Sequence, residues 1–515
     1  MDALLAIWSW FADNILTQPA YFIGCIVVVG YALLKKPIYD IIAGFIKAVI
    51  GYQILLVGSG GLVSAFRPVL VGLKARFNLS AMVIDPYFGQ NAVQAGMEDP
   101  HGPAFIAGHT FSSVMFLLLF AFVLNIILVA LKRYTKCRAL FTTGHVQVQQ
   151  ATTAFWLVLF CFPQLNDVTV LAVMTVLLGV YWAVGANLCI GPTQDLTDGA
   201  GLTIAHQQMF GVYVSSRIAA WMGTRSKKRL RRIEDIQMPG FLKIFNENLV
   251  STAILMTVFF GAILVVLGKP FLVEQHFMTE NQDFLMYILT TSFSFAVYLS
   301  ILQLGVRTFV TELTNSFHGI SSKLLKGSVP GVDCAVTYGF GSPNAVTVGF
   351  LFGALGQFLA IAGLLILKSP VVVIAGFVPL FFDNATIGVY ANNKGGLKAC
   401  IVLPFVSGLL QVFGSALIAG WVGMAAYGGY LGMWDWAVVW PVMTGVMRIL
   451  SFAGLAIVVI ALLAIPQLQY RANRDTYFME VEDYPRAKRM RAERARAGRA
   501  EQPDPDQAVP VPAKR

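Results

Sequence analysis

Long apolar segments recur along the whole chain, and they restrict what it can fold into. About eleven of them are long enough to cross the hydrocarbon core of a bilayer, which takes about 20 residues. They cover residues 19–34, 41–65, 104–131, 139–163, 168–190, 248–268, 283–305, 345–367, 371–391, 399–422 and 437–466. Hydrophobic residues make up 57% of the sequence and charged residues only 12%, about half the charged fraction of a soluble domain. The sequence therefore predicts an all-α polytopic membrane protein with about eleven transmembrane helices.

The net charge of +10 is unevenly placed. Basic residues cluster in 225–232, within a connection at 223–247, and in the tail 471–515, with smaller groups at 35–36 and 132–136. Under the positive-inside rule these segments are cytoplasmic, which puts the N-terminus outside and the C-terminus in the cytoplasm. We expect a multi-pass protein of the cytoplasmic membrane, with the cations serving topology and lipid head groups rather than nucleic acid. The Pro-rich, arginine-rich tail is expected to be disordered beyond about residue 485.

Six cysteines show no C-x-x-C spacing and lie mostly in apolar runs. This pattern is typical of small buried residues rather than of redox or metal chemistry. We expect no metal, no cofactor and no cleavable signal peptide.

Two blocks of uncharged polar residues interrupt the apolar sequence. They are 142–150 and 191–208, and they contain His145, Gln149, Gln150, His206 and Gln207. Because hydrocarbon cannot satisfy such groups, they must face one another, a cavity or a cargo. Hydrogen bonds between helices explain a single glutamine equally well. The whole set favours a binding site for a hydroxyl-rich solute.

Asp333 is a carboxyl group close to a glycine-rich stretch at 339–343 and far from any Lys or Arg in the sequence. An intramembrane acid indicates function by default. Three roles remain open: accepting hydrogen bonds from substrate hydroxyls, coupling to protons, or capping a half-helix.

The two halves of the chain share a weak pattern. Asp85 and Asp333 each precede an apolar span, and 143–150 can be laid over 386–393. We interpret residues 1–470 as one membrane domain whose halves, roughly 40–222 and 248–425, are inverted repeats with a site at their interface. Glycine stretches at 58–61 and 339–343 are expected to break helices at membrane depth.

The chain resembles the ascorbate-type IIC permease of the phosphoenolpyruvate-dependent phosphotransferase system over about residues 15–470. The resemblance is carried by Thr143-Gly-His-x-x-x-Gln149-Gln150, Pro192-Thr-Gln-x-x-Thr197-Asp198-Gly199, His206-Gln207-Gln208, Asp333-Cys334-Ala335 and 376–388. The segment 85–90 and the long basic tail depart from the family pattern.

The resemblance implies a homodimer, with a mobile core that carries L-ascorbate inward past a dimerisation domain. A separate IIB protein, supplied through IIA, HPr and enzyme I, would then phosphorylate the substrate to ascorbate 6-phosphate. No catalytic residue is expected in this chain, because the donor cysteine lies on IIB. Substrate contacts carried over from the family pattern are Ser59, Tyr87, His145, Gln149, Gln150, His206, Gln207 and Asp333.

Two other functions remain compatible with the residues. An ion-coupled secondary transporter of an acidic or polyol sugar would use Asp333 for coupling, without phosphorylation. A binding-only sensor would signal through the basic tail.

Overall fold

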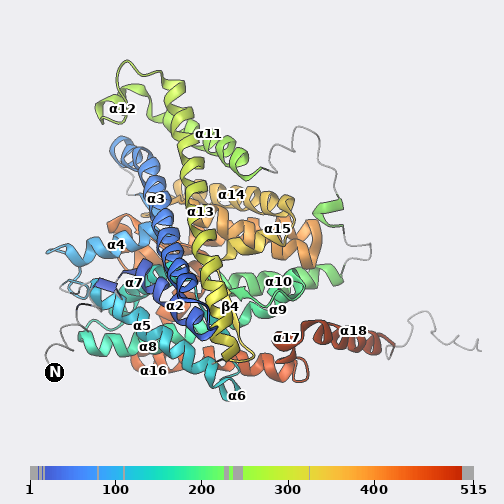
Figure 1. Cartoon of the computed structure of the whole chain (residues 1–515). Coiled ribbons are helices and arrows are strands. Elements are labelled where there is room, and N and C mark those ends of the chain that lie inside the picture. Colours follow the sequence, from blue (N-terminus) through green and yellow to red (C-terminus); the bar gives the residue numbers. More distant parts are fainter. Residues whose placement is uncertain are drawn as a thin grey trace, which may run out of the picture.

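Helices make up most of the chain (Figure 1). The computed structural model describes residues 10, 14–15, 18–77, 81–107, 109, 111–225, 231–235, 247–323 and 325–500. The α-helices are α2 (Pro19–Leu33), α3 (Ile38–Phe77), α4 (Pro86–Glu98), α5 (Phe111–Ala130), α6 (Lys132–Thr135), α7 (Gly144–Cys161), α8 (Asp167–Leu188), α9 (Ile190–Thr197), α10 (Met209–Thr224), α11 (Asn248–Leu267), α12 (Lys269–Glu274), α13 (Phe284–Lys323), α14 (Pro343–Ile366), α15 (Asn384–Trp421), α16 (Trp434–Ala472), α17 (Met479–Glu482) and α18 (Tyr484–Ala500). Shorter turns are η2 (Ile233–Asp235), η4 (Cys334–Gly339), η5 (Val378–Asp383) and η6 (Met424–Tyr427).

Several helices have the length and apolar composition of membrane spans. Within the described residues, five meet both criteria: Ile38–Gly58, Asp167–Thr197, Asn344–Ile366, Val378–Trp421 and Trp434–Ala472. Shorter apolar helices lie in α2, α5, α11 and α13. The chain is therefore a mostly helical, multi-pass membrane protein, as its composition predicts. The total of about eleven spans stays a prediction.

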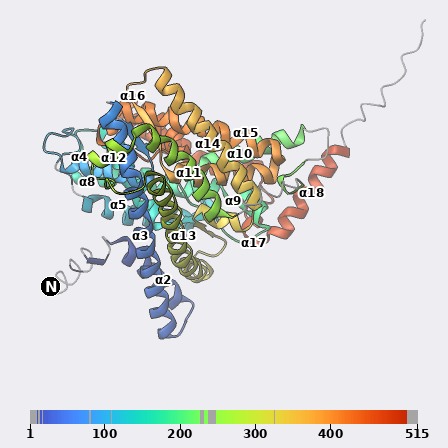
Figure 2. The same cartoon turned by 90° about the horizontal axis from the view of Figure 1, so that it is seen from above.

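The two 40-residue helices α3 and α13 pack against each other, with α2 and α11 beside them (Figures 1 and 2). The expected break at 58–61 is absent, because α3 continues through these glycines. A Cβ on Gly61 would lie 2.1 Å from the Tyr298 ring of α13. The glycine thus permits close helix approach, and the prediction of a broken helix here was wrong. The second expected break is present, since η4 ends at Gly339 and α14 begins at Pro343.

Two small parallel sheets lie among the helices. One has the strand order β5 (Val372–Ala375), β1 (Ala81–Ile84), β6 (Gly429–Tyr430). The other has the order β2 (Ala139–Phe141), β4 (Val329–Val332), β3 (Thr203–Ile204). Each central strand is paired on both sides with strands from the other half of the chain. An all-helical fold class is thus correct for the spans and incomplete at these sheets.

Bends divide the long second-half helices. The expected span 371–391 consists of strand β5, the π-helical turn η5 and the start of α15. Gly396, at φ 67°, bends α15, and Ser451, at φ 52°, bends α16. Positive φ is easily reached by glycine and is uncommon for serine. The kink at Gly396 therefore separates two apolar segments that the sequence presents as separate spans.

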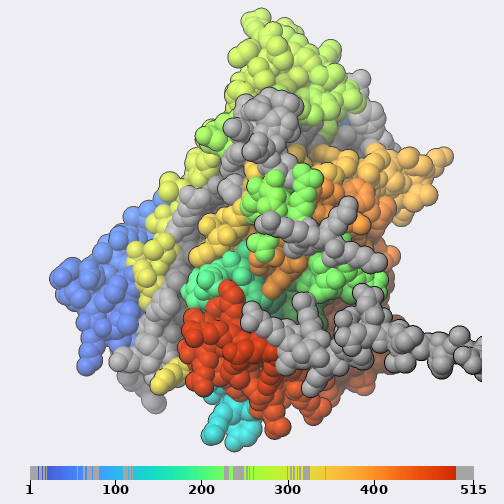
Figure 3. Space-filling view, turned by 90° about the vertical axis from the view of Figure 1, so that its right-hand side faces the viewer, coloured from blue at the N-terminus to red at the C-terminus, as the bar shows by residue number. Residues whose placement is uncertain are grey.

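The basic tail is folded as far as Ala500, which corrects the expectation of disorder for residues 485–500. Helix α18 is anchored to α9: Tyr484 donates a 2.8 Å hydrogen bond to Asp195, and Lys488 pairs with Asp198 at 2.7 Å. Burial and the neighbouring Asp195 carboxylate raise the pKa of Tyr484, so its hydroxyl stays a donor. Figure 3 shows the C-terminal segment, in red, packed on the body of the molecule. Residues 501–515 lie outside the described residues, as do 226–230 and 236–246 of the basic connection.

Candidate functional site

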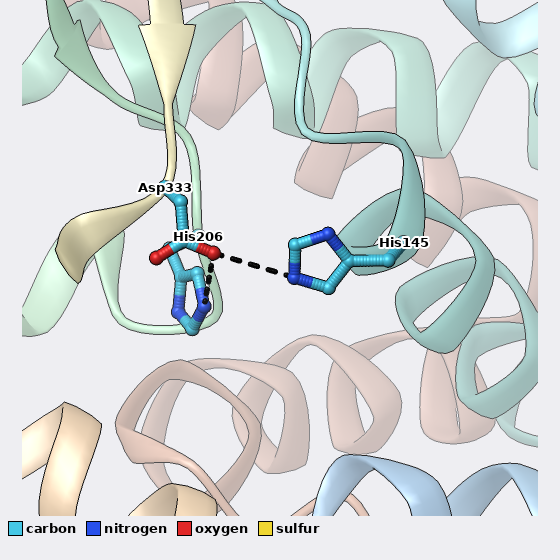
Figure 4. Close-up of side chains that lie close together, drawn as sticks. All are labelled: His145, His206 and Asp333. Atoms are coloured by element: carbon cyan, nitrogen blue, oxygen red, sulfur yellow. Dashed lines mark ion pairs between the residues drawn. The ribbon is translucent and has the colours of Figure 1, made fainter. Parts of the chain in front are cut away.

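The sheet β2–β4–β3 gathers the polar blocks at one point. Its three strands are parallel, so their carboxyl ends meet at the same edge of the sheet. Beyond that edge the chain continues into His145 after β2, His206 after β3 and Asp333 after β4. Figure 4 shows the two imidazole rings directed at the Asp333 carboxylate. Side chains separated by up to 188 positions in sequence, 145 to 333, are thus placed together.

The three side chains form a buried triad, which we call the His–Asp–His triad (His145, Asp333, His206). Nε2 of His145 lies 3.3 Å from Oδ2 of Asp333, and Nε2 of His206 lies 3.7 Å from the same oxygen. All three are buried. The other oxygen of Asp333, Oδ1, accepts a 2.9 Å hydrogen bond from the backbone N–H of Ala335 and caps η4. One carboxylate oxygen is therefore structural and the other faces the histidines.

Hydrogen bonding fixes the orientation of His206. Its Nδ1 lies 2.7 Å from Oε1 of Gln208, whose Nε2 in turn donates to the Phe382 carbonyl at 3.4 Å. Because Oε1 can only accept, Nδ1 carries the proton and Nε2 faces the Asp333 carboxylate. A bare nitrogen lone pair and a carboxylate repel, so this pair is stable when one proton is held between them. The Asp333–His206 separation of 3.7 Å is longer than a hydrogen bond, so a shared proton requires the two side chains to move closer together.

Two glutamines of the first block have different surroundings. Oε1 of Gln149 accepts a 3.0 Å hydrogen bond from Gln207, whose own Oε1 has no partner within the described residues. Gln150 is occupied at both amide atoms: it donates to the His206 carbonyl at 3.1 Å and accepts from Trp182 at 2.7 Å. Gln149 and Gln207 thus keep capacity for a ligand, whereas Gln150 positions the His206 backbone.

The two remaining predicted contacts come from the first half. Tyr87 lies at the start of α4, where its side chain interacts with that of Gln149 and lies near Asp333. It joins the residues around the triad. Ser59 lies in α3, and its side chain is outside the described part of the structure.

The structure adds residues that sequence reasoning missed. Gln208 orients His206, and Tyr338 donates a 3.1 Å hydrogen bond to the same Phe382 carbonyl that Gln208 contacts. The Phe309 ring of α13 packs edge-on to His145, with 5.7 Å between ring centroids. Gln208 could have been found as the end of the His206-Gln207-Gln208 motif. Phe309 gives no signal, because it resembles any apolar residue in a span.

A buried aspartate holds the second block in place. Asp435 accepts hydrogen bonds from the backbone N–H groups of Phe210 (3.1 Å) and Gly211 (3.0 Å) and from the Tyr181 hydroxyl (2.7 Å). These amides belong to the first turn of α10, directly after His206-Gln207-Gln208. Charge-assisted bonds of this kind stabilise a helix N-terminus. Asp435 therefore fixes the position at which the chain leaves the site.

The donor set of the triad also has the composition of a metal site. Within the described residues, one nitrogen from each histidine and one oxygen of Asp333 lie within 4.8 Å of one another. Imidazole and carboxylate are ligands that zinc accepts. An ion would compete with the proton for the space beside Oδ2, and the expectation of no metal stays a prediction.

Comparison with known proteins gives two matches. The sequence model of the EIIC-GAT family, described as "PTS system sugar-specific permease component", matches residues 14–438. A protein of Mycoplasma pneumoniae named "Ascorbate-specific PTS system EIIC component" is 35% identical over 437 residues, in an alignment that covers 78% of this chain. The chain spans 65% of the length of that relative.

Proposed function

Because the chain belongs to the family of sugar-specific permease components of the phosphotransferase system, we propose that it binds L-ascorbate at the His–Asp–His triad and carries it into the cell. The single observation that supports the site most directly is the meeting of both polar blocks and Asp333 at one sheet edge. The name of the relative supports the substrate.

The chemistry of the site suits a weakly acidic, hydroxylated solute. Gln149, Gln207 and Tyr87 offer neutral donors and acceptors, and Nδ1 of His145 has no partner within the described residues. Asp333 alone would repel a monoanion such as ascorbate. A proton held between Asp333 and His206 removes that repulsion, so the anion can bind without a fixed cation. Among the described side chains of this cluster there is no Lys or Arg, which favours release after transport.

Phosphorylation would follow on the cytoplasmic side. A phosphocysteine of a separate IIB protein, itself supplied through IIA, HPr and enzyme I, would meet the 6-hydroxyl of bound ascorbate. The S–P bond breaks as an O–P bond forms, the cysteine leaves as a thiolate, and the hydroxyl proton passes to it. Asp333 would orient the hydroxyl, so this chain contributes positioning rather than a covalent intermediate.

Movement of the site is supported by the grouping of helices. Helices α2, α3, α11 and α13 pack together, and the triad lies on other elements. Phe309 of α13 contacts His145 across the boundary between these groups. We infer an elevator-like motion in which the triad-bearing part slides along α3 and α13, in a homodimer. The exchange of central strands between the halves supports inverted repeats.

An ion-coupled secondary transporter is the second candidate, and the triad is the observation that favours it. A buried proton between Asp333 and His206 could be released as substrate leaves. Uptake would then follow a proton gradient and need no IIB protein.

Transport of labelled ascorbate into proteoliposomes separates the two. We expect uptake only with phosphorylated IIB present, with ascorbate 6-phosphate as the product and no loss on collapse of ion gradients. Gln149→Ala should reduce uptake by tenfold or more, since it removes the acceptor for Gln207 and the contact to Tyr87.

Gln147→Ala is the matched control on the same helix, because Gln147 donates to the Phe141 carbonyl and makes no hydrogen bond to the triad within the described residues. It should affect folding yield more than affinity. Gradient-driven uptake without IIB would exclude the phosphotransferase role. Normal uptake by Gln149→Ala would exclude the site.

A further inference from the structure

A cavity of about 540 Å³ lies apart from the triad, between α10, the end of α16 and the C-terminal segment. Its walls come from α8, α9, α10, α15, α16 and α17, and from Arg491 of α18. The tail therefore forms part of the wall rather than projecting away from it. The volume is within the range of small-molecule sites.

The charge of the lining is positive. Four cations, Arg138, Arg217, Lys394 and Arg491, face two acids, Asp195 and Glu480. Three of the cations are engaged with these acids: Arg138 with Glu480, Lys394 with Asp195, and Arg491 with both. Arg217 has no acidic partner within the described residues. Two positive charges remain in excess, so the lining matches a dianion.

A buried hydroxyl next to Arg217 lacks a partner. Ser216 lines the cavity, is 3% exposed, and its Oγ makes no hydrogen bond within the described residues. A buried polar atom of this kind costs free energy unless a ligand or water satisfies it. Ser216 and Arg217 occupy successive positions of α10, so their side chains leave the helix in different directions, one buried and the other exposed. Both line the cavity, and a hydroxyl and a guanidinium are groups that suit phosphate oxygens.

One strand, β2, runs from the wall of the cavity towards the triad. Arg138, in the cavity wall, directly precedes β2, whose far end leads to Thr142 and His145. The four steps from Arg138 to Thr142 span about 13 Å at the usual rise of a strand. Arg138 and the tail share the face that the cation distribution assigns to the cytoplasm. The cavity therefore lies on the side of the molecule toward which a ligand released inward from the triad would move.

We propose that this cavity is a cytoplasmic site for a phosphate monoester of sugar size, held by Arg217 and Ser216 with Arg138 and Arg491 behind them. The identity of its source, the phosphorylated sugar made at the triad, rests on the function proposed above. Free inorganic phosphate shares the chemistry and is the competing source. The sugar part of an ester would contact the polar wall formed by Asn187, Asn473 and Thr476.

Binding to the full-length protein in nanodiscs tests the site by calorimetry. The probes are ascorbate 6-phosphate, glucose 6-phosphate, inorganic phosphate and ascorbate. We expect saturable binding of the esters, with inorganic phosphate weaker. Arg217→Gln should weaken ester binding at least tenfold, and Ser216→Ala should weaken it by a smaller factor. Both variants should bind ascorbate as the wild type does.

Arg225→Gln is the matched control, because Arg225 is exposed one residue beyond α10 and packs on the Trp221 ring outside the cavity. It should bind the esters normally. Equal loss in Arg225→Gln would reduce the effect to general surface charge and overturn the site. Inorganic phosphate binding as tightly as the esters would overturn the assignment to a sugar phosphate.

The ascorbate function and the cavity site can be refuted independently. Gln149→Ala should lose ascorbate and keep the esters, the opposite of Arg217→Gln. Ester binding that depends on Arg217 in a protein that ignores ascorbate would leave the cavity site standing and refute the ascorbate function. Ascorbate transport without Arg217-dependent ester binding would refute the cavity site alone.

Discussion

Asp85 and Asp333 are the same residue type in similar settings, yet they do different work. Each follows a central strand, and each Oδ1 accepts a backbone N–H two residues on: Tyr87 for Asp85 at 3.0 Å and Ala335 for Asp333 at 2.9 Å. Oδ2 of Asp85 accepts the backbone N–H of Val378 at 3.2 Å. Oδ2 of Asp333 instead faces two histidines. Only Asp333 keeps an oxygen for exchangeable partners.

This difference predicts opposite outcomes for two matched substitutions. Asp333→Asn should lower ascorbate affinity tenfold or more, because the amide cannot share a proton with His206, while the fold survives. Asp85→Asn keeps one acceptor oxygen, so it loses the hydrogen bond to one backbone amide and the charge assistance at the other, and it should lower the free energy of unfolding by about 1–3 kcal/mol. Calorimetry measures the ascorbate affinity of each variant, and unfolding in detergent measures its stability. A pair of variants with the same profile would contradict this division.

The sequence predicts much of the site because its polar residues stand out against apolar surroundings. That contrast, together with the family resemblance, was sufficient to predict a set of candidate site residues: His145, Gln149, His206, Gln207 and Asp333. The difference in hydrogen bonding between Gln149 and Gln150 could not be predicted. It depends on Trp182 and the His206 carbonyl, which reach Gln150 from other elements.

At the scale of elements, apolar length predicted the helices well and the strands not at all. Strands of two to four residues, such as β3 and β4, carry no usable alternation, and their partners are far away in the sequence. The glycine stretches did not predict reliably where a helix breaks, and the reason is physical. It breaks a helix between η4 and α14, yet in α3 it allows close packing without a break.

The order of elements also suggests a different register for the repeat. Both β2 and β5 are followed by helical structure, beginning at Gly144 and at Val378. The sequence alignment placed Thr143 over Thr386, which lies more than two turns farther into its helical segment. Matching by strand ends therefore pairs Thr143 with residues near Phe377.

Glycines between α14 and α15 give an element-scale prediction. A Cβ on Gly408 would lie 2.2 Å from the backbone oxygen of Gly353, and backbone cannot move aside as a flexible side chain can. Gly408→Ala should therefore lower the free energy of unfolding by about 1–3 kcal/mol. Gly445→Ala is the control, since its Cβ would meet nothing within 4 Å. There, helix propensity favours alanine by up to about 1 kcal/mol. Equal thermal midpoints for the two variants would contradict the packing explanation.

At the scale of the whole molecule, α13 is long enough to reach from one face of the membrane to the other. Its 40 residues span about 60 Å, twice the thickness of the hydrocarbon core, so we expect its ends to lie on opposite sides of the membrane. Beyond its C-terminal end, the Lys326 carbonyl accepts a hydrogen bond from Lys132 of α6. The loop before its N-terminal end carries Glu280 and Asp283. Lys132 and Lys326 thus lie near one end of α13, and the positive-inside rule predicts that α6 and the tail face the cytoplasm.

Labelling of single cysteines tests this orientation. Five of the six native cysteines are buried, and Cys25 is half-buried. Cys25→Ser therefore provides a background in which native cysteines should not react with the label. In that background, Glu280→Cys should react with a membrane-impermeant maleimide in intact cells, because Glu280 is exposed in the outer loop. Arg474→Cys, exposed after α16, should react only after the membrane is permeabilised. The reverse pattern would place the tail and its cavity outside. That result would contradict both the cytoplasmic approach of IIB and a cytoplasmic site for the phosphorylated product.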